Sequence, residues 1–428
     1  MKIISSVKGT RDFYPEQMRI RSWLYRTMGR VSTLFGYQEY DGPFLEYMDL
    51  YAAKSGEELV KEQAFVFQDR GGEWITLRPE LTPTLARMVA QKQRQLTYPL
   101  RWWSFGPMWR YERPQKGRTR EFFQWNIDLI GVDTPEGDAE LVAIGATFLR
   151  EVGLRPSEVQ ILVNNRRLVD AQLDTLSIPA AQRPAVLRLI DRREKMSAEK
   201  WRDYALETVG LEASQFDGLC AILENSGLWQ ESEELVRLFA ALEALGVREY
   251  VRYAPEIVRG LDYYTGTVFE ARDVHGEFRA ILGGGRYDNL VAAVGGSPLA
   301  GVGFAMGDVV ITLVLEKFGR IPDAQTLAPA PVLVTVFDAE SQPDSMRLAA
   351  QLRAAGIPAA LYPEAAKLGK QLKHAQRIGA PAAVIAGPEE IANGQVSVKD
   401  LQRREQHTVS LENLVETLQK ILAQNKAS

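Results

Sequence analysis

Arginine and aromatic residues are interleaved between residues 101 and 120, and this combination could bind an anion. The stretch contains six basic residues and a single acid, Glu112, together with five aromatic side chains: Trp102, Trp103, Phe105, Trp109 and Tyr111. Guanidinium groups hold carboxylate and phosphate oxygens through paired, charge-assisted hydrogen bonds. A solvent-exposed, arginine-rich hairpin would have the same composition, so an anionic ligand is one of two interpretations.

Polar residues from well-separated segments, each beside a strand pattern, could meet on one sheet: Glu80, Arg110, Gln124, Asp128 and Arg259. Such a face would suit a zwitterion. Its carboxylates would receive an ammonium group, and its guanidinium groups would hold a carboxylate or a phosphate. Taken singly, each residue could instead belong to a surface ion pair or a strand edge, so the hypothesis depends on the group.

Glycine-rich segments follow two strand patterns, GGGRYDNL at 283–290 and GVGFAMG at 301–307. Backbone without side chains lets a planar or anionic ligand approach closely, but neither segment matches a phosphate loop or a dinucleotide-binding fingerprint. The segment VRGLDYYTG places Arg259, Tyr263 and Tyr264 close together. Adjacent tyrosines usually supply one ring to the core and one to a surface or pocket.

Hydrophobic spacing indicates the elements that would position these residues. Apolar residues at helical spacing predict a long helix that begins near Pro15 and ends before Gly36. Strand patterns follow at 37–40, 64–68 and 74–78, and the last leads into a helix with Thr82 as expected N-cap and Pro83 at its first position. Patterns at 102–111 and 122–130 predict an antiparallel pair of strands.

The rest of the chain divides into segments that differ in composition and in the spacing of their apolar residues. Residues 166–249 are rich in Glu, Arg, Leu and Ala at helical spacing and predict a helical insertion, after which strand and glycine patterns return. The segment 321–331 is small and proline-rich, as linkers are. Alternating strand and helix patterns beyond it predict a compact α/β domain.

Composition excludes several classes of protein. A length of 428 residues corresponds to about three folding units, and 46% hydrophobic with 25% charged residues is typical of a globular chain. No apolar run approaches the ~18 residues that span a bilayer, so we expect a cytoplasmic protein without membrane association. The single cysteine, Cys220, excludes an intramolecular disulfide, and three scattered histidines argue against a zinc site. The net charge of -4 argues against attraction of the whole molecule to nucleic acid.

In these motifs the chain resembles histidyl-tRNA synthetase, a class II aminoacyl-tRNA synthetase, over essentially its whole length. The motifs GTRDFYP, TLRPELTP, PMWRYERPQKGRTREFFQ, VRGLDYYTGTVFE, GGGRYDNLV and GVGFAMG occur in the family's order. The resemblance implies an α+β fold: a catalytic domain (1–165 and 250–322) with a six-stranded antiparallel sheet flanked by helices, a helical insertion (166–249), a linker (323–330) and a C-terminal α/β anticodon-binding domain (331–428). It also implies a homodimer.

The resemblance further implies a reaction. L-Histidine and ATP would form histidyl-adenylate, and the histidyl group would pass to the 3′ end of tRNA(His). ATP would act as its Mg2+ complex, the ligands of the metal are not evident, and no prosthetic group is expected. Arg110 and Arg259 are implied to be catalytic, because fixed positive charge stabilises the attack of the histidine carboxylate on the α-phosphorus.

Residue roles follow from the motif positions. For ATP the resemblance implies Arg110, Glu112, Arg118, Phe122, Phe123 and Gln124, with Phe122 or Phe123 stacking on adenine. For histidine it implies Glu80, Leu81, Thr82, Arg110, Gln124, Asp128, Arg259, Tyr263 and Tyr264. For tRNA it implies Arg113 and Gln115 in the loop of the second motif.

One motif departs from the family. The third motif usually reads Gly-x-Glu-Arg, with the arginine facing ATP, whereas this chain has Val310 at the arginine position, in Gly307-Asp308-Val309-Val310. Either Arg118 and its neighbours suffice for the triphosphate, or ATP binding is impaired.

Impaired ATP binding would suit two other functions. The first is the synthetase-like, histidine-binding regulatory subunit of ATP phosphoribosyltransferase, which typically lacks the C-terminal domain, and the second is an RNA-binding or kinase-linked pseudo-synthetase. The C-terminal domain and the retained Arg110, Arg118 and Arg259 favour the synthetase.

Four cations recur at helical spacing in the C-terminal domain: Lys367, Lys370, Lys373 and Arg377. Residues three or four apart share a helix face. The functional interpretation is that they contact phosphates of the tRNA anticodon stem, which positions the RNA without reading its sequence. The alternative is a surface helix with ordinary solubilising charges.

Overall fold

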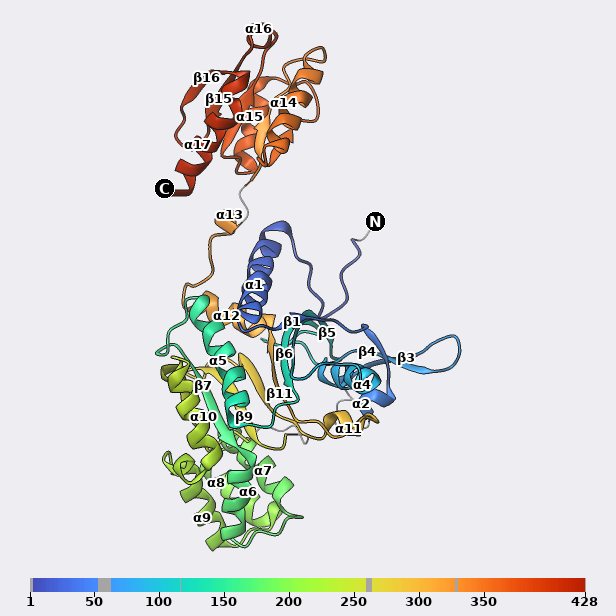
Figure 1. Ribbon diagram of the computed structural model, residues 1–428, viewed down its shortest axis with the longest axis vertical. Helices are drawn as coiled ribbons and strands as arrows, with labels where there is room; N and C mark the ends of the chain where they lie inside the picture. The colour runs from blue at the N-terminus through green and yellow to red at the C-terminus, as the bar shows by residue number, and fades with distance from the viewer. Residues whose placement is uncertain (1–2, 53–62, 116, 259–263, 328–329, 428) are drawn as a thin grey trace. The chain divides into compact units, whose positions relative to one another are not determined.

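The computed structural model describes residues 3–52, 63–115, 117–258, 264–327 and 330–427 (Figure 1). The chain forms two compact units. One comprises the residues up to Phe13 together with Arg21–Ile321, and the other comprises Tyr14–Ile20 together with the chain from Pro322 onward.

The larger unit is built on an eight-stranded sheet whose six central strands are antiparallel (Figure 1). The strand order is β1-β5-β6-β11-β10-β9-β7-β8. β1 pairs in parallel with β5, and β8 pairs in parallel with β7. The predicted six-stranded antiparallel sheet is thus confirmed, and a short parallel strand extends each of its edges. The strands are β1 Gln38–Glu39, β5 Leu100–Trp109, β6 Glu121–Ile130, β7 Val159–Asn165, β8 Val251–Tyr253, β9 Thr267–Asp273, β10 Leu282–Arg286 and β11 Gly301–Gly307.

Helices cover the sheet and enclose its main core. α1 (Pro15–Leu34) begins and ends where the sequence predicts, and Gly36 at φ 80° provides the left-handed backbone that stops it. α5 (Pro135–Glu151) is capped by the Thr134 side chain, which accepts a hydrogen bond from the Gly137 N–H. Packed against them are α10 (Glu233–Ala244) and α12 (Asp308–Lys317). The core contains Leu24, Met28, Trp125, Phe148, Leu238 and Phe304.

A smaller antiparallel sheet, β2-β4-β3, lies beside α4 in the same unit. Its strands are β2 Leu45–Tyr47, β3 Phe65–Gln68 and β4 Trp74–Leu77, and its helices are α2 Asp49–Ala52 and α4 Thr82–Lys92. The expected N-cap of α4 was wrong: Thr82 is already helical, and the fully buried Leu81 takes the cap position without a side-chain hydrogen bond. Pro83 fits the first turn because N–H groups there have no partner within the helix.

The predicted helical insertion contains two packing groups. Helices α6 (Arg166–Thr175) to α9 (Ala213–Glu224) enclose a separate small core with Leu189, Trp201 and Phe216. α10 instead packs against α5 in the main core (Figure 1). The remaining short elements of the unit are α7 Arg183–Asp191, η2 Arg193–Lys195, α8 Ala198–Asp203, the π-helical η3 Tyr204–Val209, η4 Leu228–Glu231, η5 Arg248–Tyr250 and α11 Leu290–Ala293.

The C-terminal unit has a five-stranded mixed sheet in the order β13-β12-β14-β15-β16. β12 pairs in parallel with β13 and β14, and the remaining pairs are antiparallel. The strands are β12 Val332–Val334, β13 Ala359–Leu361, β14 Ala382–Ile385, β15 Gln395–Asp400 and β16 Gln406–Ser410. The helices are α13 Ala324–Leu327, α14 Gln342–Ala354, α15 Leu368–Arg377, α16 Pro388–Ala392, η6 Leu411–Asn413 and α17 Leu414–Ala427. Alternating strands and helices confirm the predicted α/β character.

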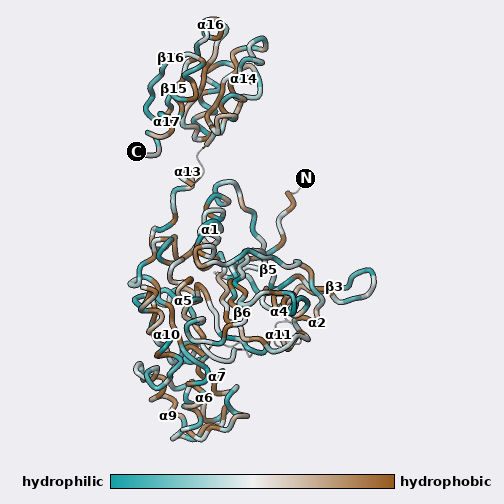
Figure 2. Tube along the Cα trace, viewed as in Figure 1, coloured by the Kyte–Doolittle hydropathy of each residue, from teal (hydrophilic) through white to brown (hydrophobic). Residues whose placement is uncertain are grey.

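None of the described helices combines the length and the apolar composition that crossing a bilayer requires. Along α1, the longest helix, hydrophobic and hydrophilic residues alternate in short steps (Figure 2).

Candidate active site

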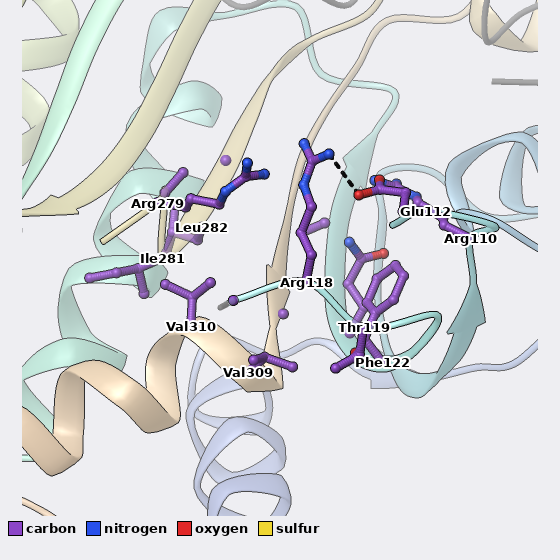
Figure 3. Close-up of a pocket in the computed structure, with 16 residues that line it drawn as sticks. Arg110, Glu112, Arg118, Thr119, Phe122, Arg279, Ile281, Leu282, Val309 and Val310 are labelled. Atoms are coloured by element: carbon purple, nitrogen blue, oxygen red, sulfur yellow. Dashed lines mark ion pairs between the residues drawn. The ribbon is translucent and has the colours of Figure 1, made fainter. Parts of the chain in front are cut away.

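A cavity of about 290 Å³ lies on the large sheet and carries strong positive charge (Figure 3). β6, β10 and β11 contribute to its walls, together with the β5–β6 loop, the β9–β10 connection and the first turn of α12. Three guanidinium groups face it, from Arg110, Arg118 and Arg279, against one carboxylate, Glu112. Small residues, among them Ala305 and Gly307, leave the sheet backbone accessible.

Arg110 is held at the end of β5 by contacts with its backbone and its side-chain stem. Its N–H donates to the Arg120 carbonyl at 2.9 Å, which closes the base of the loop. Its Nε donates to the Pro79 carbonyl at 3.0 Å, and the guanidinium carbon lies 5.3 Å from the centre of the Phe122 ring. One edge of the guanidinium is thereby fixed while the group lines the cavity beside an aromatic ring.

Arg118 and Glu112 form an ion pair across the β5–β6 loop, with Nη1 and Oε2 at 2.7 Å (Figure 3). Backbone hydrogen bonds in both directions between Gln115 and Arg118, at 3.1 and 2.8 Å, hold the tip of the loop. The Arg118 side chain remains exposed, so a ligand phosphate can compete for it. Arg113 and Gln115, the residues implied to contact tRNA, are also exposed in this loop.

Gln124 lines the cavity on the same face of β6 as Phe122. Its Oε1 is buried, and among the described residues it accepts no hydrogen bond. A buried acceptor without a partner costs about 1–3 kcal/mol, so a donor group on a bound ligand would stabilise this site.

The structure corrects the assignment of Phe123 to ATP. Its ring lies on the opposite face of β6, 5.9 Å from the centre of the Phe105 ring, with the Arg21 guanidinium 3.2 Å above it. Neighbouring residues of a strand point to opposite faces, so only Phe122 faces the cavity. Stacking of Phe122 on adenine stays a prediction.

Asp128 lies further along β6 and does not line the cavity. Burial raises the pKa of Asp128 to about 7, although a hydrogen bond from the Tyr287 hydroxyl to Oδ1 opposes this shift. A Cβ at Gly303, the register partner of Asp128 on β11, would lie only 2.1 Å from Oδ1. The glycine of the GVGFAMG segment therefore makes room for the Asp128 carboxyl group.

The other predicted histidine-binding residues differ in their burial and in their surroundings. Glu80 is buried between β4 and α4, and Thr82 is partly buried at the start of α4. Leu81 is fully buried, and its carbonyl accepts from the Leu85 N–H at 3.0 Å. Tyr264 is buried with its ring close to Gly285, where an added Cβ would lie 2.8 Å from a ring carbon. Two predicted residues, Arg259 and Tyr263, lie outside the described residues.

Two residues near the cavity were not predicted from sequence. Arg279 lines it, and Asp308 anchors its wall: one Asp308 oxygen accepts from Arg11 Nη2 at 2.8 Å and the other from the Phe123 N–H at 2.9 Å. Asp308 thus ties α12 to β6 and to the GTRDFYP segment. In the sequence, this contact was signalled by Arg11 of the GTRDFYP motif, to which no role had been assigned.

The four predicted cations of the C-terminal unit are exposed on or beside α15. Lys367 precedes the helix as its N-cap residue, and the other three lie within it. Lys370 Nζ is 3.1 Å from a Glu364 oxygen. Their contact with tRNA stays a prediction.

No group of three or more His, Cys, Asp or Glu residues that could hold a metal ion occurs in the described part of the chain.

Comparison with known proteins places the chain in a family. The family model for histidyl-tRNA synthetase matches residues 9–307, and that for an anticodon-binding domain matches residues 330–421. The histidine–tRNA ligase of Thermoplasma volcanium is 39% identical, over 97% of this chain and 99% of that protein. The histidine–tRNA ligase of Leptospira biflexa is 36% identical, over 97% of this chain and 96% of that protein.

A solved structure agrees with these matches. The histidyl-tRNA synthetase from Nostoc sp. PCC 7120 superimposes with a TM-score of 0.83 at 26% identity, over 98% of this chain and 100% of that one. With a positively charged cavity on an antiparallel sheet and relatives that match nearly from end to end, the chain belongs to the histidyl-tRNA synthetase family of class II aminoacyl-tRNA synthetases.

Proposed function

We propose that the chain is a histidine–tRNA ligase, which activates L-histidine with ATP to histidyl-adenylate and transfers the histidyl group to the 3′ end of tRNA(His). The observation that carries the proposal is the cavity, which combines three guanidinium groups with the Phe122 ring and the unsatisfied Gln124 oxygen. Arginines suit two anionic reactants that must approach each other, and an aromatic ring suits a nucleobase.

The chemical role of the cavity is electrostatic. When the histidine carboxylate attacks the α-phosphorus, negative charge builds on the leaving pyrophosphate, and fixed guanidinium groups stabilise it without reorganisation. We assign this role to Arg110, with its Nε held by the Pro79 carbonyl, and to Arg259. ATP enters as its Mg2+ complex, and Mg2+ neutralises phosphate charge in the substrate.

Phe122 is assigned to adenine and Arg118 to the phosphates. We keep Glu80, Thr82, Gln124 and Asp128 as the polar groups for the α-ammonium and main-chain groups of histidine, and Tyr263 and Tyr264 for the imidazole pocket. The positions of Phe122 and Gln124 on the cavity face of β6 and of Thr82 at the start of α4 support these assignments.

The division of the chain supports the same function. We propose a catalytic domain (1–165 and 250–322), a helical insertion (166–249), a linker (323–330) and an anticodon-binding domain (331–428). The alternative, a regulatory subunit of ATP phosphoribosyltransferase, is not favoured, because the relatives that match nearly the whole chain are named histidine–tRNA ligases and an anticodon-binding domain is present.

A homodimer is also proposed. The small sheet β2-β4-β3 and its flanks expose several large apolar side chains: Phe44, Leu45, Tyr47, Phe67 and Trp74. Strand pairing places Leu45, Tyr47 and Phe67 on one face of this sheet and Trp74 on the other. An exposed apolar face of this kind marks an interface in many proteins, and a self-complementary interface generates a two-fold dimer.

The test is histidine-dependent exchange of pyrophosphate into ATP, followed by charging of tRNA(His). A ligase shows both activities. Histidine binding without exchange would support a regulatory subunit, and tRNA binding without either activity would support an RNA-binding module.

A further inference from the structure

Arg279 lines the active-site cavity from the connection between β9 and β10, and it occupies the region that Val310 leaves without charge. A Cβ at Gly117 would lie 3.8 Å from Val310 Cγ2 and 4.0 Å from Arg279 Cδ. The loop of the second motif, the start of α12 and the Arg279 side chain therefore meet at one point. Figure 3 shows Arg279 and Glu112 on opposite sides of Arg118.

The residues before Arg279 are anchored away from the cavity. The Asp273 carboxylate accepts hydrogen bonds from the backbone N–H groups of Glu277 and Phe278, each at 3.0 Å. Lys317 forms an ion pair with Glu277, and its Nζ lies 5.7 Å from the centre of the Phe278 ring. These contacts hold the connection against α12 and leave Arg279 as the member of the segment that carries charge into the cavity.

Among the described residues, no side chain or carbonyl forms a hydrogen bond or an ion pair with the Arg279 guanidinium. Partial burial and the neighbouring charge of Arg118 lower the pKa of Arg279, and Glu112 opposes this shift. Glu112 is already paired with Arg118. Two adjacent guanidinium groups thus share a single carboxylate, and an anion with several oxygens would relieve their repulsion.

The cavity has two chemically different ends. Arg110 lies against the Phe122 ring at one end, and Arg279 lies with Val310 and Gly117 at the other. A nucleotide whose base stacks on Phe122 directs its α-phosphate to Arg110 and extends its further phosphates towards Arg118 and Arg279.

We propose that Arg279 binds the β- and γ-phosphates of ATP together with Arg118, and so supplies the positive charge that Val310 does not. The proposal rests on the ligase function proposed above. The same contacts hold pyrophosphate as it leaves, so Arg279 acts on ATP affinity and on the pyrophosphate-dependent reverse reaction, and not on the recognition of histidine or adenine.

The experiment compares Arg279→Met, which keeps the aliphatic stem, with Arg279→Lys, which keeps a charge but not the fork. Pyrophosphate exchange should show an ATP KM raised about tenfold to a hundredfold in Arg279→Met, as expected for a lost hydrogen bond to a charged group, and a smaller rise in Arg279→Lys. The histidine KM and the inhibition by AMP should remain those of the wild type. Arg237→Met, which removes an exposed arginine paired with Glu136 outside the cavity, is the matched control.

The double variant Arg279→Met/Val310→Arg separates a charge role from a structural one. Val310 and the Arg279 stem both lie close to Gly117, so an arginine at position 310 should lower the ATP KM again relative to Arg279→Met alone. An ATP KM in Arg279→Met equal to that of the wild type, or a rise matched by AMP affinity, would overturn the proposal.

Failure of the proposal for Arg279 can be distinguished from failure of the proposed ligase function. If the wild type lacked exchange, the proposed function would fail, while calorimetric titration of ATP and AMP into the wild type and Arg279→Met would still decide the role of Arg279.

Discussion

Single side chains in and near the cavity are held in place by hydrogen bonds to neighbouring groups. Arg110 is fixed through its Nε and Asp128 through the Tyr287 hydroxyl. Such support keeps polar groups in one orientation before a ligand arrives, so that little reorganisation is needed when it binds. Asp128 differs from the arginines because its charge depends on pH in the physiological range.

We predict that Asp128 makes the protein less stable as pH rises from about 4 to about 7. The folded-state pKa is about 7, against 3.8 for the model carboxyl group. The folded state therefore binds more protons in this interval, and the free energy of unfolding falls by about 1.4 kcal/mol per pH unit from this group.

Denaturant unfolding of the wild type and Asp128→Asn at several pH values measures this effect. The variant, neutral throughout, should gain stability relative to the wild type as pH rises through the interval. A constant difference between the two proteins at all pH values would show that the carboxyl group titrates normally.

At the level of secondary structure, three strands and a helix start decide the shape of the cavity. β6, β10 and β11 pair in register, which places Gly307 opposite Gln124 and Gly303 opposite Asp128. The two glycines of β11 differ in the space around them. A Cβ at Gly307 would meet no atom within 4 Å, whereas one at Gly303 would overlap the Asp128 carboxyl group.

We predict that Gly307→Val blocks the nucleotide without harming the fold. The backbone at Gly307 has φ -80° and ψ 141°, which valine adopts readily. Stability should change by less than about 0.5 kcal/mol, while the ATP KM should rise about tenfold or more because the added methyl groups occupy the cavity, a loss of about 1.4 kcal/mol in binding.

Gly303→Ala is the contrasting variant on the same strand. It should lower stability by about 1–3 kcal/mol through overpacking. Thermal melting and exchange kinetics together check the pair, and an unaltered ATP KM in Gly307→Val would place the nucleotide elsewhere.

At the scale of the whole molecule, the chain joins a cavity for small molecules to surfaces that suit larger partners. The apolar residues of the small sheet suit a second copy of the chain, and the cations of α15 suit RNA phosphates. Each surface can be changed without touching a residue that lines the cavity.

We predict that Tyr47→Glu converts a dimer to monomers. Tyr47 shares a sheet face with Leu45 and Phe67 and is 62% exposed, and a buried carboxylate at an interface without a partner strongly disfavours association. Sedimentation at micromolar concentration would show the mass fall by half. Phe337→Glu, which changes an aromatic residue of the C-terminal unit that is 60% exposed, should leave the mass unchanged; a monomeric wild type would contradict the dimer.

We predict that Lys370→Gln/Lys373→Gln weakens tRNA binding but leaves tRNA-independent pyrophosphate exchange normal. The slope of log affinity against log salt should flatten by about one unit for each lost phosphate contact. Lys420→Gln, which removes an exposed lysine of α17 paired with Glu416, is the control. An identical tRNA KM and salt slope in the double variant would assign the α15 cations to solubility.

Local features of this protein were determined by the sequence alone. The limits of α1 follow from Pro15 and Gly36, and the β5–β6 pair follows from two apolar runs around a polar turn. The motif residues Arg110, Arg118 and Gln124 do share one cavity. These features depend on residues near one another in the chain, so the local sequence pattern is sufficient to predict them.

Only the tertiary structure decided how distant segments combine. Arg279 reaches the cavity because β10 pairs with β11 and β11 with β6, and no local pattern marks it. The choice between Phe122 and Phe123 needed the face that the sheet turns to the cavity, and the partner of Asp308 needed the return of the N-terminal segment to α12. Pairing between strands that are distant in sequence determines these contacts. The side chains involved meet only when the sheet is complete, so the local sequence pattern does not show the energy of their interactions.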